Sequence, residues 1–154
     1  MHTLIRVLLS AVVALGFIGA AAAQEHGTKA EAEAMAQAAM AHVKKVGAEQ
    51  AFKDFTEDKA NWSKKDLYVF AIGHDGLCLG HGANAKLVGK NLIGLKDAAG
   101  KEFVKELVAT SKGSGTGWVD YDWAHPQTKK VEGKTSYVVR LAGFDGLVGV
   151  GVYR

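Results

Sequence analysis

The chain has only one cysteine, and this scarcity removes several classes of protein. Cys78 cannot form a disulfide within the chain, and the C-x-x-C-H motif of covalent haem attachment is absent. A structural zinc site built from two knuckles is also unsupported, because no second Cys or His pair follows. We therefore expect a fold that depends on a packed core, in which Cys78 is a small buried hydrophobe.

Familiar catalytic and phosphate-binding motifs are missing as well. The sequence has no G-x-S-x-G, H-E-x-x-H or G-x-x-x-x-G-K-[ST] motif. The nearest glycine-rich stretch, GSGTG at 113–117, precedes a predicted strand, so it cannot present a helix N-terminus to a phosphate. The 19 basic and 16 acidic residues are interspersed and form no dense basic cluster. We predict no enzymatic activity, no cofactor and no nucleic-acid partner.

Only one long hydrophobic run occurs, and it lies at the N-terminus. Residues 7–19 are almost entirely apolar, follow Arg6 and precede Ala21-Ala22-Ala23. A basic start, an apolar core and an A-x-A site are typical of a secretory signal, and the run is shorter than the roughly 20 residues of a membrane span. We predict a signal peptide at 1–23 and a periplasmic or secreted domain at 24–154 without a membrane span. The alternative is an uncleaved N-terminal anchor.

The remaining residues predict one α+β domain. Thr28 and Glu31 match a capping box ahead of a helix that ends at Gly47, and a second helix follows around Phe52. A further helix is predicted at 101–111. Strands are predicted at 67–72, 77–81, 117–123, 133–141 and 147–153. Asp-Gly turns join neighbouring strands, so the sheet should be antiparallel, with helices on one face and room for a ligand on the other.

Three potential metal ligands, His74, Cys78 and His81, lie within eight positions. One interpretation is a metal or redox site. Side chains alternate along a strand, however, so Cys78 and His81 should point to opposite faces, and His74 should belong to the turn. We therefore expect no metal site here and keep only His81, as a polar group at the rim of a pocket.

Two strands carry side chains suited to a small anion. In GWVDYDW, alternation places Tyr121 and Trp123 on one face, where they can wall a pocket. In GKTSYVVR, Lys134 and Arg140 can pair with a carboxylate and Tyr137 can donate a hydrogen bond. Cationic and hydroxyl donors beside aromatic walls suit a small carboxylate. The competing interpretation is ordinary core packing of the aromatics and solvated strand charges.

Four stretches together resemble a known family. They are DLYVFAIGHDGLCLGHGANAKLVGKNL, GKEFVKELV, GTGWVDYDW and KTSYVVRLAGFDGLVGVGVY. They are similar to single Cache domains of type 2, which are extracytoplasmic sensor modules of bacterial chemoreceptors and histidine kinases. The resemblance implies a long N-terminal helix packed on a PAS-like antiparallel sheet of about five strands. It also implies binding of a small organic acid of two to four carbons, with five pocket residues: His81, Tyr121, Trp123, Lys134 and Tyr137.

The chain also departs from the family pattern. Gly82 and Ala85 stand where relatives often have proline, and the chain stops at Arg154 without a further helix or output domain. We expect a free-standing sensor domain, monomeric or homodimeric, that works with a membrane receptor or transporter partner. Two alternatives stay open: an interaction module that kept the fold without a ligand, and a metal or redox protein that uses His74, Cys78 and His81.

Overall fold

A computed structural model describes residues 25–154, so the predicted signal peptide and its cleavage site lie outside the described residues. The helices are α1 (Lys29–Val46), α2 (Ala48–Glu57), α3 (Lys59–Trp62) and α4 (Phe103–Gly113), with a 3-10 turn η1 (Ala85–Leu87). The strands are β1 (Ser63–Lys64), β2 (Leu67–Gly73), β3 (Cys78–His81), β4 (Thr116–Ala124), β5 (Val131–Arg140) and β6 (Gly146–Tyr153). No helix within 25–154 is long and apolar enough to cross a membrane.

The predicted start and end of the long helix α1 are confirmed. The Thr28 hydroxyl accepts the Glu31 N–H at 3.2 Å, and the Glu31 carboxylate accepts the Thr28 N–H at 2.9 Å. This reciprocal capping box satisfies two of the helix's unpaired donors. Gly47, with a φ of 88°, then ends α1 and directly precedes α2. Glycine adopts this left-handed φ without the steric cost that other residues meet.

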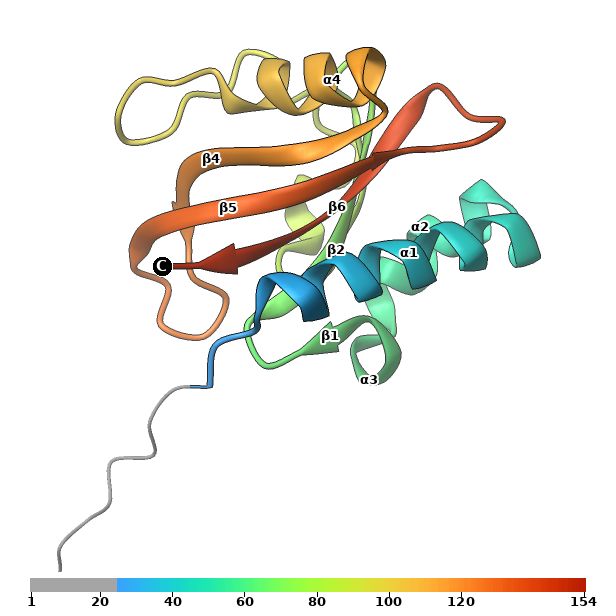
Figure 1. Cartoon of the computed structure of the whole chain (residues 1–154), viewed down its shortest axis with the longest axis horizontal. Helices are drawn as coiled ribbons and strands as arrows, with labels where there is room; N and C mark the ends of the chain where they lie inside the picture. Colours follow the sequence, from blue (N-terminus) through green and yellow to red (C-terminus); the bar gives the residue numbers. More distant parts are fainter. Residues whose placement is uncertain (1–24) are drawn as a thin grey trace, which may run out of the picture.

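The predicted antiparallel sheet is present, with the strand order β1-β2-β6-β5-β4, while β3 also pairs with β2 (Figure 1). It has six strands where the resemblance implied about five, because the two-residue β1 adds to the five predicted strands. All pairings are antiparallel. The fold is therefore the α+β arrangement that the sequence predicted.

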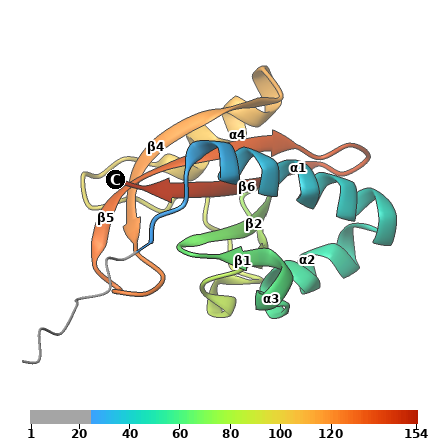
Figure 2. The ribbon, with the colours of Figure 1, turned by 60° about the horizontal axis from the view of Figure 1, so that its bottom comes forward.

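Helices cover both faces of this sheet, and each face forms its own apolar core. Helices α1 and α2 pack on the face that carries Val69, Val148 and Val150. Helix α4 and the segment 82–102 cover the opposite face, which carries Phe70 and Val119 (Figures 1 and 2). The sequence predicted helices on one face and room for a ligand on the other; the structure adds that α4 covers the second face as well. The ligand candidates lie beneath α4.

A bulge in β3 overturns the predicted divergence of Cys78 and His81. Phe70 pairs with His81 and Ile72 pairs with Cys78, so two steps along β2 match three steps along β3. The extra residue is Leu79, which packs instead toward the core under α2. A bulge of this kind breaks the two-residue alternation. Both Cys78 and His81 consequently lie on the α4 side of the sheet.

Candidate functional site

Lys134 in β5 is the unusual residue of the α4 side, because its side chain is buried in an aromatic environment. The residue is 1% exposed, and its Nζ donates a hydrogen bond to the Tyr68 hydroxyl at 2.7 Å. The Tyr68 hydroxyl lies 3.2 Å from that of Tyr153, which donates to the carbonyl of Ala124 at 2.8 Å. The ammonium also lies 4.3 Å from the ring centre of Tyr68 and 5.2 Å from that of Tyr153, which suits cation–π attraction.

Two glycines of β6 make room for this arrangement. A Cβ atom at Gly151 would stand 2.2 Å from Lys134 Cε, and one at Gly149 would stand 2.2 Å from the Phe70 ring. Both distances are far below van der Waals contact. The G-x-G pattern of the last strand is therefore what allows the lysine and the phenyl ring to lie flat on the sheet.

A small cavity borders the lysine. Its volume is about 20 Å³, and it is lined by Phe70, Ile72, His81, Leu92, Phe103, Leu107, Tyr121, Trp123 and Lys134. That volume holds about one water molecule. Its polar lining residues are Lys134, Tyr121 and His81, and the others are mainly aliphatic and aromatic.

Tyr121 and Trp123 form one wall of the cavity, as their alternation predicted. The Tyr121 ring stacks on Phe103 of α4 with 4.4 Å between centres and 7° between planes, and Trp123 lies 5.3 Å from Phe103. The Tyr121 hydroxyl lies 2.8 Å from Ser136 Oγ. Burial raises the pKa of Tyr121 well above its usual value, so the hydroxyl keeps its proton and remains a donor.

His81 is a buried, neutral side chain with a defined tautomer. Its Nδ1 accepts the backbone N–H groups of Ala83 at 3.2 Å and Asn84 at 3.0 Å. Because Nδ1 is an acceptor, the proton of the neutral ring lies on Nε2. Burial, together with the positive charges of Lys134 and Lys59, lowers the pKa of His81 to about 3. His81 can therefore donate one hydrogen bond from Nε2 but carries no charge at neutral pH.

The electrostatics of the site centre on Lys134. Burial lowers the pKa of this lysine to about 7, and the negative charge of Asp66 acts in the opposite direction. No carboxylate within residues 25–154 forms an ion pair with it. A buried ammonium without a paired anion is costly. An anion that entered the cavity would remove that cost.

Four of the five predicted pocket residues are brought together, and Tyr137 is not. His81, Tyr121, Trp123 and Lys134 line the same cavity. Tyr137 lies on the opposite face, where its ring packs 5.3 Å from Trp118 and beside the core under α1. The reason is the two-residue period of a strand, since positions 134 and 137 differ by three. The same rule, applied to the K-x-x-Y spacing, would have separated them.

Sequence reasoning missed the two tyrosines nearest the ammonium, Tyr68 and Tyr153. Each lies in a strand whose existence was predicted, but β2 and β6 approach Lys134 only through the pairing of β2, β6 and β5. Tyr153 is the direct partner of Lys134 in that register. The only sequence feature that could have predicted a role for either residue was the tyrosine hydroxyl at the end of the G-x-G-x-Y pattern.

His74 and Cys78 are engaged in other interactions. His74 lies in the β2–β3 turn, as predicted, where its Nδ1 meets Asp145 at 2.6 Å and its Nε2 meets Ser111 at 2.9 Å. Cys78 is buried, and burial raises the pKa of its thiol to about 11. His74, Cys78 and His81 do not converge as a ligand set in the described part of the chain.

A second hollow lies on the other side of β3, between α2, η1 and the β5–β6 loop. Its volume is about 560 Å³, and its floor is mainly apolar, with Phe52, Leu79, Val88 and Phe144. Val88 is 39% and Phe144 36% exposed. This groove is open and lacks a buried charge.

Helices on both faces of an antiparallel sheet define an α+β fold, and solved structures share this fold. A methyl-accepting chemotaxis protein from Vibrio parahaemolyticus matches with a TM-score of 0.68 and 27% identity over 81% of this chain and 87% of that chain. A Cache chemosensory domain described for its carboxylic acid recognition matches with a TM-score of 0.68 and 26% identity, over 80% and 91% of the two chains. The model of the Single Cache domain 2 family matches residues 8–154, and the chain belongs to this family.

Two curated relatives belong to larger signalling proteins. The sensor histidine kinase MctS of Rhizobium johnstonii is 37% identical over 89 residues, which are 58% of this chain and 19% of the kinase. The methyl-accepting chemotaxis protein McpP of Pseudomonas putida is 33% identical over 73 residues, which are 47% of this chain and 13% of the chemotaxis protein. The chain thus spans less than a fifth of either relative's length.

Proposed function

We propose that this Cache domain is an extracytoplasmic sensor module that binds a small monocarboxylate at Lys134. The observation that carries the proposal is the buried ammonium that faces a cavity and has no paired carboxylate within residues 25–154. A carboxylate there would accept a charge-assisted hydrogen bond, which is worth about 1.5–3 kcal/mol. The likeness to a chemosensory domain described for carboxylic acid recognition supports the same ligand class.

The cavity also suits the rest of such a molecule. Beside the ammonium, the Tyr121 hydroxyl and His81 Nε2–H are neutral donors that line the cavity. Among the other lining residues, Ile72, Leu92 and Leu107 offer only apolar contact. A single cation among apolar lining residues favours a monocarboxylate of two to four carbons over a dicarboxylate or an amino acid.

The cavity must open before such a ligand can bind. Its volume of about 20 Å³ is smaller than any carboxylic acid. The covering residues Leu92 and Phe103 come from the segment 82–102 and from the start of α4, whereas Lys134 lies on the sheet. We infer that the cover moves away from the sheet when the ligand enters.

Localisation and partners follow from the same proposal. The basic, apolar and small-residue segments before residue 24 fit export to the periplasm. The relatives are a sensor kinase and a chemotaxis protein by name, so the partner we propose is a receptor or transporter at the membrane. A binding module without an enzymatic step fits a site whose thiol, Cys78, is buried and protonated.

Calorimetry with acetate, propionate, lactate and pyruvate tests the proposal. At least one of them should bind the wild type, and Tyr121→Phe should weaken that binding about threefold to tenfold because one donor is lost. Tyr137→Phe is the matched control, since its hydroxyl lies on the other face. No heat and no thermal stabilisation with millimolar concentrations of all four acids would refute carboxylate binding, because a ligand of the native state raises stability. Equal losses in both variants would refute the assignment of the pocket.

A second candidate is an interaction module, favoured by the open apolar groove beside α2. Its floor exposes Val88 and Phe144, which a partner could cover. Phe144→Ser should then abolish capture of the membrane partner and leave carboxylate affinity unchanged. A Phe144→Ser variant that still captures its partner as the wild type does would remove this candidate.

A further inference from the structure

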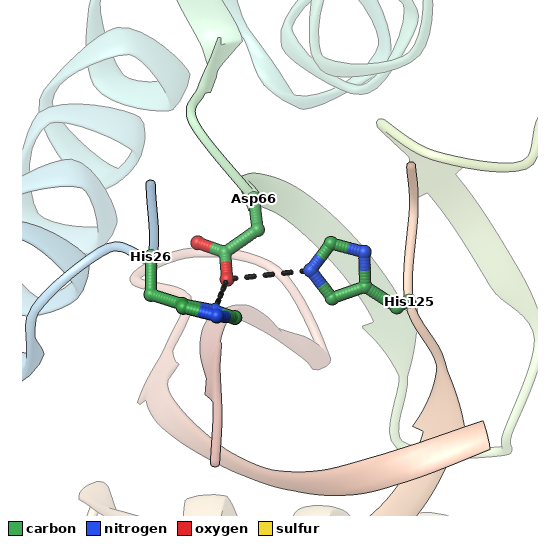
Figure 3. A group of neighbouring side chains, drawn as sticks. All are labelled: His26, Asp66 and His125. Carbon is green, nitrogen blue, oxygen red and sulfur yellow. Dashed lines mark hydrogen bonds and ion pairs between the residues drawn. The ribbon is translucent and has the colours of Figure 1, made fainter. Parts of the chain in front are cut away.

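A cluster of His26, Asp66 and His125 lies at the point where the N-terminal segment joins the domain (Figure 3). Asp66, in the β1–β2 turn, is fully buried. Its Oδ2 lies 2.8 Å from His26 Nδ1 and 3.5 Å from His125 Nε2, while its Oδ1 accepts the Gly27 N–H at 2.6 Å. His125 is fully buried, and the His26 side chain is 48% exposed. One buried carboxylate therefore holds the segment that precedes α1.

The hydrogen bonds of His125 favour a clamp over a metal site. Its Nδ1 accepts the backbone N–H groups of Gln127 at 3.2 Å and Thr128 at 3.3 Å, so the proton of the neutral ring lies on Nε2. That N–H faces Asp66 (Figure 3). A metal ion at Nε2 would have to displace this proton while Nδ1 stays an acceptor. The arrangement is that of a carboxylate which accepts hydrogen bonds from His26 and Gly27 and faces the His125 Nε2–H at 3.5 Å.

A continuous series of contacts leads from this clamp to the ammonium of the ligand site. The His125 ring lies 4.7 Å from the ring of Tyr153, whose hydroxyl lies 3.2 Å from that of Tyr68. The Tyr68 hydroxyl accepts the hydrogen bond of Lys134 Nζ at 2.7 Å. Asp66 is also the one charged group that opposes the effect of burial on the Lys134 pKa. The clamp and the ligand site thus share one electrostatic environment.

Docking of the N-terminal segment shields this environment from water. Gly27 packs so tightly on Leu67 that a Cβ atom would stand 2.3–2.6 Å from three carbons of that side chain. With the segment in place Asp66 is buried, and charges interact much more strongly across a buried, low-dielectric region than across water. If the segment left, water would reach Asp66 and screen its effect on Lys134.

We propose that Asp66 is a positioning residue of the carboxylate site: held by His26, Gly27 and His125, it keeps Lys134 protonated while the N-terminal segment is docked. This inference rests on the proposed carboxylate binding. Because coupling is reciprocal, a carboxylate bound at Lys134 favours the docked segment to the same extent as the docked segment favours binding. The segment that leads toward the chain's start is then the part of the domain that reports ligand occupancy.

The groups that face Lys134 define the expected pH dependence. They are Tyr68 on β2, His81 on β3, Tyr121 on β4 and Tyr153 on β6, together with the charge of Asp66. The cover contributes Leu92, Phe103 and Leu107, which do not titrate. The tyrosines keep their protons, since burial raises each of their pKa values, and His81 is neutral. Between pH 6 and 9, Lys134 is therefore the only group facing the site whose charge changes.

The test compares the pH profile of propionate binding in Asp66→Asn and in the wild type. If the Asp66 charge changes the protonation equilibrium of Lys134 by about tenfold, the variant binds about twofold more weakly at pH 6 and about tenfold more weakly at pH 8. The amide oxygen of the introduced asparagine can still accept the Gly27 N–H, but its NH2 group would then face the His125 Nε2–H donor. Hydrogen exchange at residues 25–30 is therefore compared with that of the wild type, to separate loss of charge from loss of the clamp. Asp120→Asn, which removes an exposed carboxylate, is the control and should match the wild type at both pH values.

Gly27→Ala tests whether docking matters separately from charge. Its Cβ displaces the segment and should shift the profile in the same direction, with faster hydrogen exchange at residues 25–30; His26→Ala serves if that variant does not fold. The coupling would be overturned if propionate binding by Asp66→Asn had the same pH dependence as binding by the wild type. It would also be overturned if Gly27→Ala displaced the segment and still bound propionate as the wild type does. NMR titration of Lys134 in the ligand-free wild type and Asp66→Asn tests the electrostatic link even if no acid binds. A failure of this link is therefore distinguishable from a failure of the proposed carboxylate binding. Tight zinc binding that Asp66→Asn abolishes would also overturn it.

Discussion

Replacement of Lys134 by methionine measures how much folding stability the protein loses by burying a charge that ligand binding requires. Methionine has nearly the length of the lysine stem and is apolar, so it fills the same channel above Gly151 without the ammonium. The substitution should therefore stabilise the free protein while it removes ligand affinity. Stability and binding are expected to move in opposite directions.

The magnitude follows from the pKa of the lysine. Burial lowers the Lys134 pKa from 10.5 to about 7, which corresponds to a cost of about 5 kcal/mol for holding the charged form in the folded protein. The variant also loses the charge-assisted hydrogen bond to Tyr68, worth about 1.5–3 kcal/mol. We expect a net rise of about 2–3 kcal/mol in the free energy of unfolding at pH 6.

The stability difference between Lys134→Met and the wild type depends on pH between about 7 and 10.5. Below pH 7 the lysine is protonated in both the folded and the unfolded chain, and the full cost is present. Between pH 7 and 10.5 the unfolded chain holds a proton that the folded protein lacks, so wild-type stability rises with pH. At pH 9 this rise amounts to about 3 kcal/mol, and the advantage of Lys134→Met should disappear.

Urea unfolding at pH 6 and pH 9 measures both effects, with Lys130→Met as control. Lys130 is exposed in the β4–β5 hairpin, so its replacement should change stability by less than about 0.5 kcal/mol at either pH. Calorimetry on the same Lys134→Met protein should show at least a tenfold loss of carboxylate affinity. A variant that is less stable than the wild type by the same amount at both pH values would refute the buried-charge argument.

Three further outcomes are expected. Gly151→Ala should destabilise the protein by about 1–3 kcal/mol and weaken carboxylate binding, because the new Cβ collides with Lys134. The control Gly113→Ala should do neither, since nothing lies within 4 Å of a Cβ at that position. A Gly151→Ala variant with wild-type stability would contradict the packing described for Lys134. Because the pKa of His81 is about 3, the free energy of unfolding should fall by about 1.4 kcal/mol per pH unit as the pH drops from 6 to 4. In this range the histidine is protonated in the unfolded chain but neutral in the folded protein. The same pH dependence of stability in His81→Asn would disprove this. Because the Cys78 thiol is buried and its pKa is about 11, it should react with a disulfide reagent at pH 8 only after denaturation. Rapid labelling of Cys78 in the folded protein would contradict this and support a redox function.

Local sequence patterns were sufficient for the elements themselves. The capping box at Thr28, the stop at Gly47 and the turn at Asp75-Gly76 all act within a few residues, so their effect can be predicted from neighbours alone. The β5–β6 hairpin instead turns at Gly143, which has a φ of 75°, and Gly146 is already the first residue of β6. The strand alternation that placed Tyr121 and Trp123 together is also local, and it holds because β4 has no bulge.

The alternation failed where the structure departs from a regular strand or where two residues were assigned together in spite of their spacing. Cys78 and His81 share a face because Leu79 is bulged, and nothing in the LCLGH stretch announces the extra residue. Tyr137 was grouped with Lys134 as a hydrogen-bond donor, and again through the family resemblance, although three positions separate them. A period-two argument is thus reliable only when the partner strand is known.

The sequence by itself determined the α+β class, the order of elements and the placement of Tyr121 and Trp123 on one face, because these follow from periodicity and from short-range turn chemistry. Only the tertiary structure decided that Lys134 is buried, that Tyr68 and Tyr153 solvate it and that Asp66 acts on it from beside the N-terminal segment. Those properties depend on which strands pair and on what covers them. A pKa of about 7 for a lysine is a property of that assembled environment, and the one-dimensional pattern does not contain it.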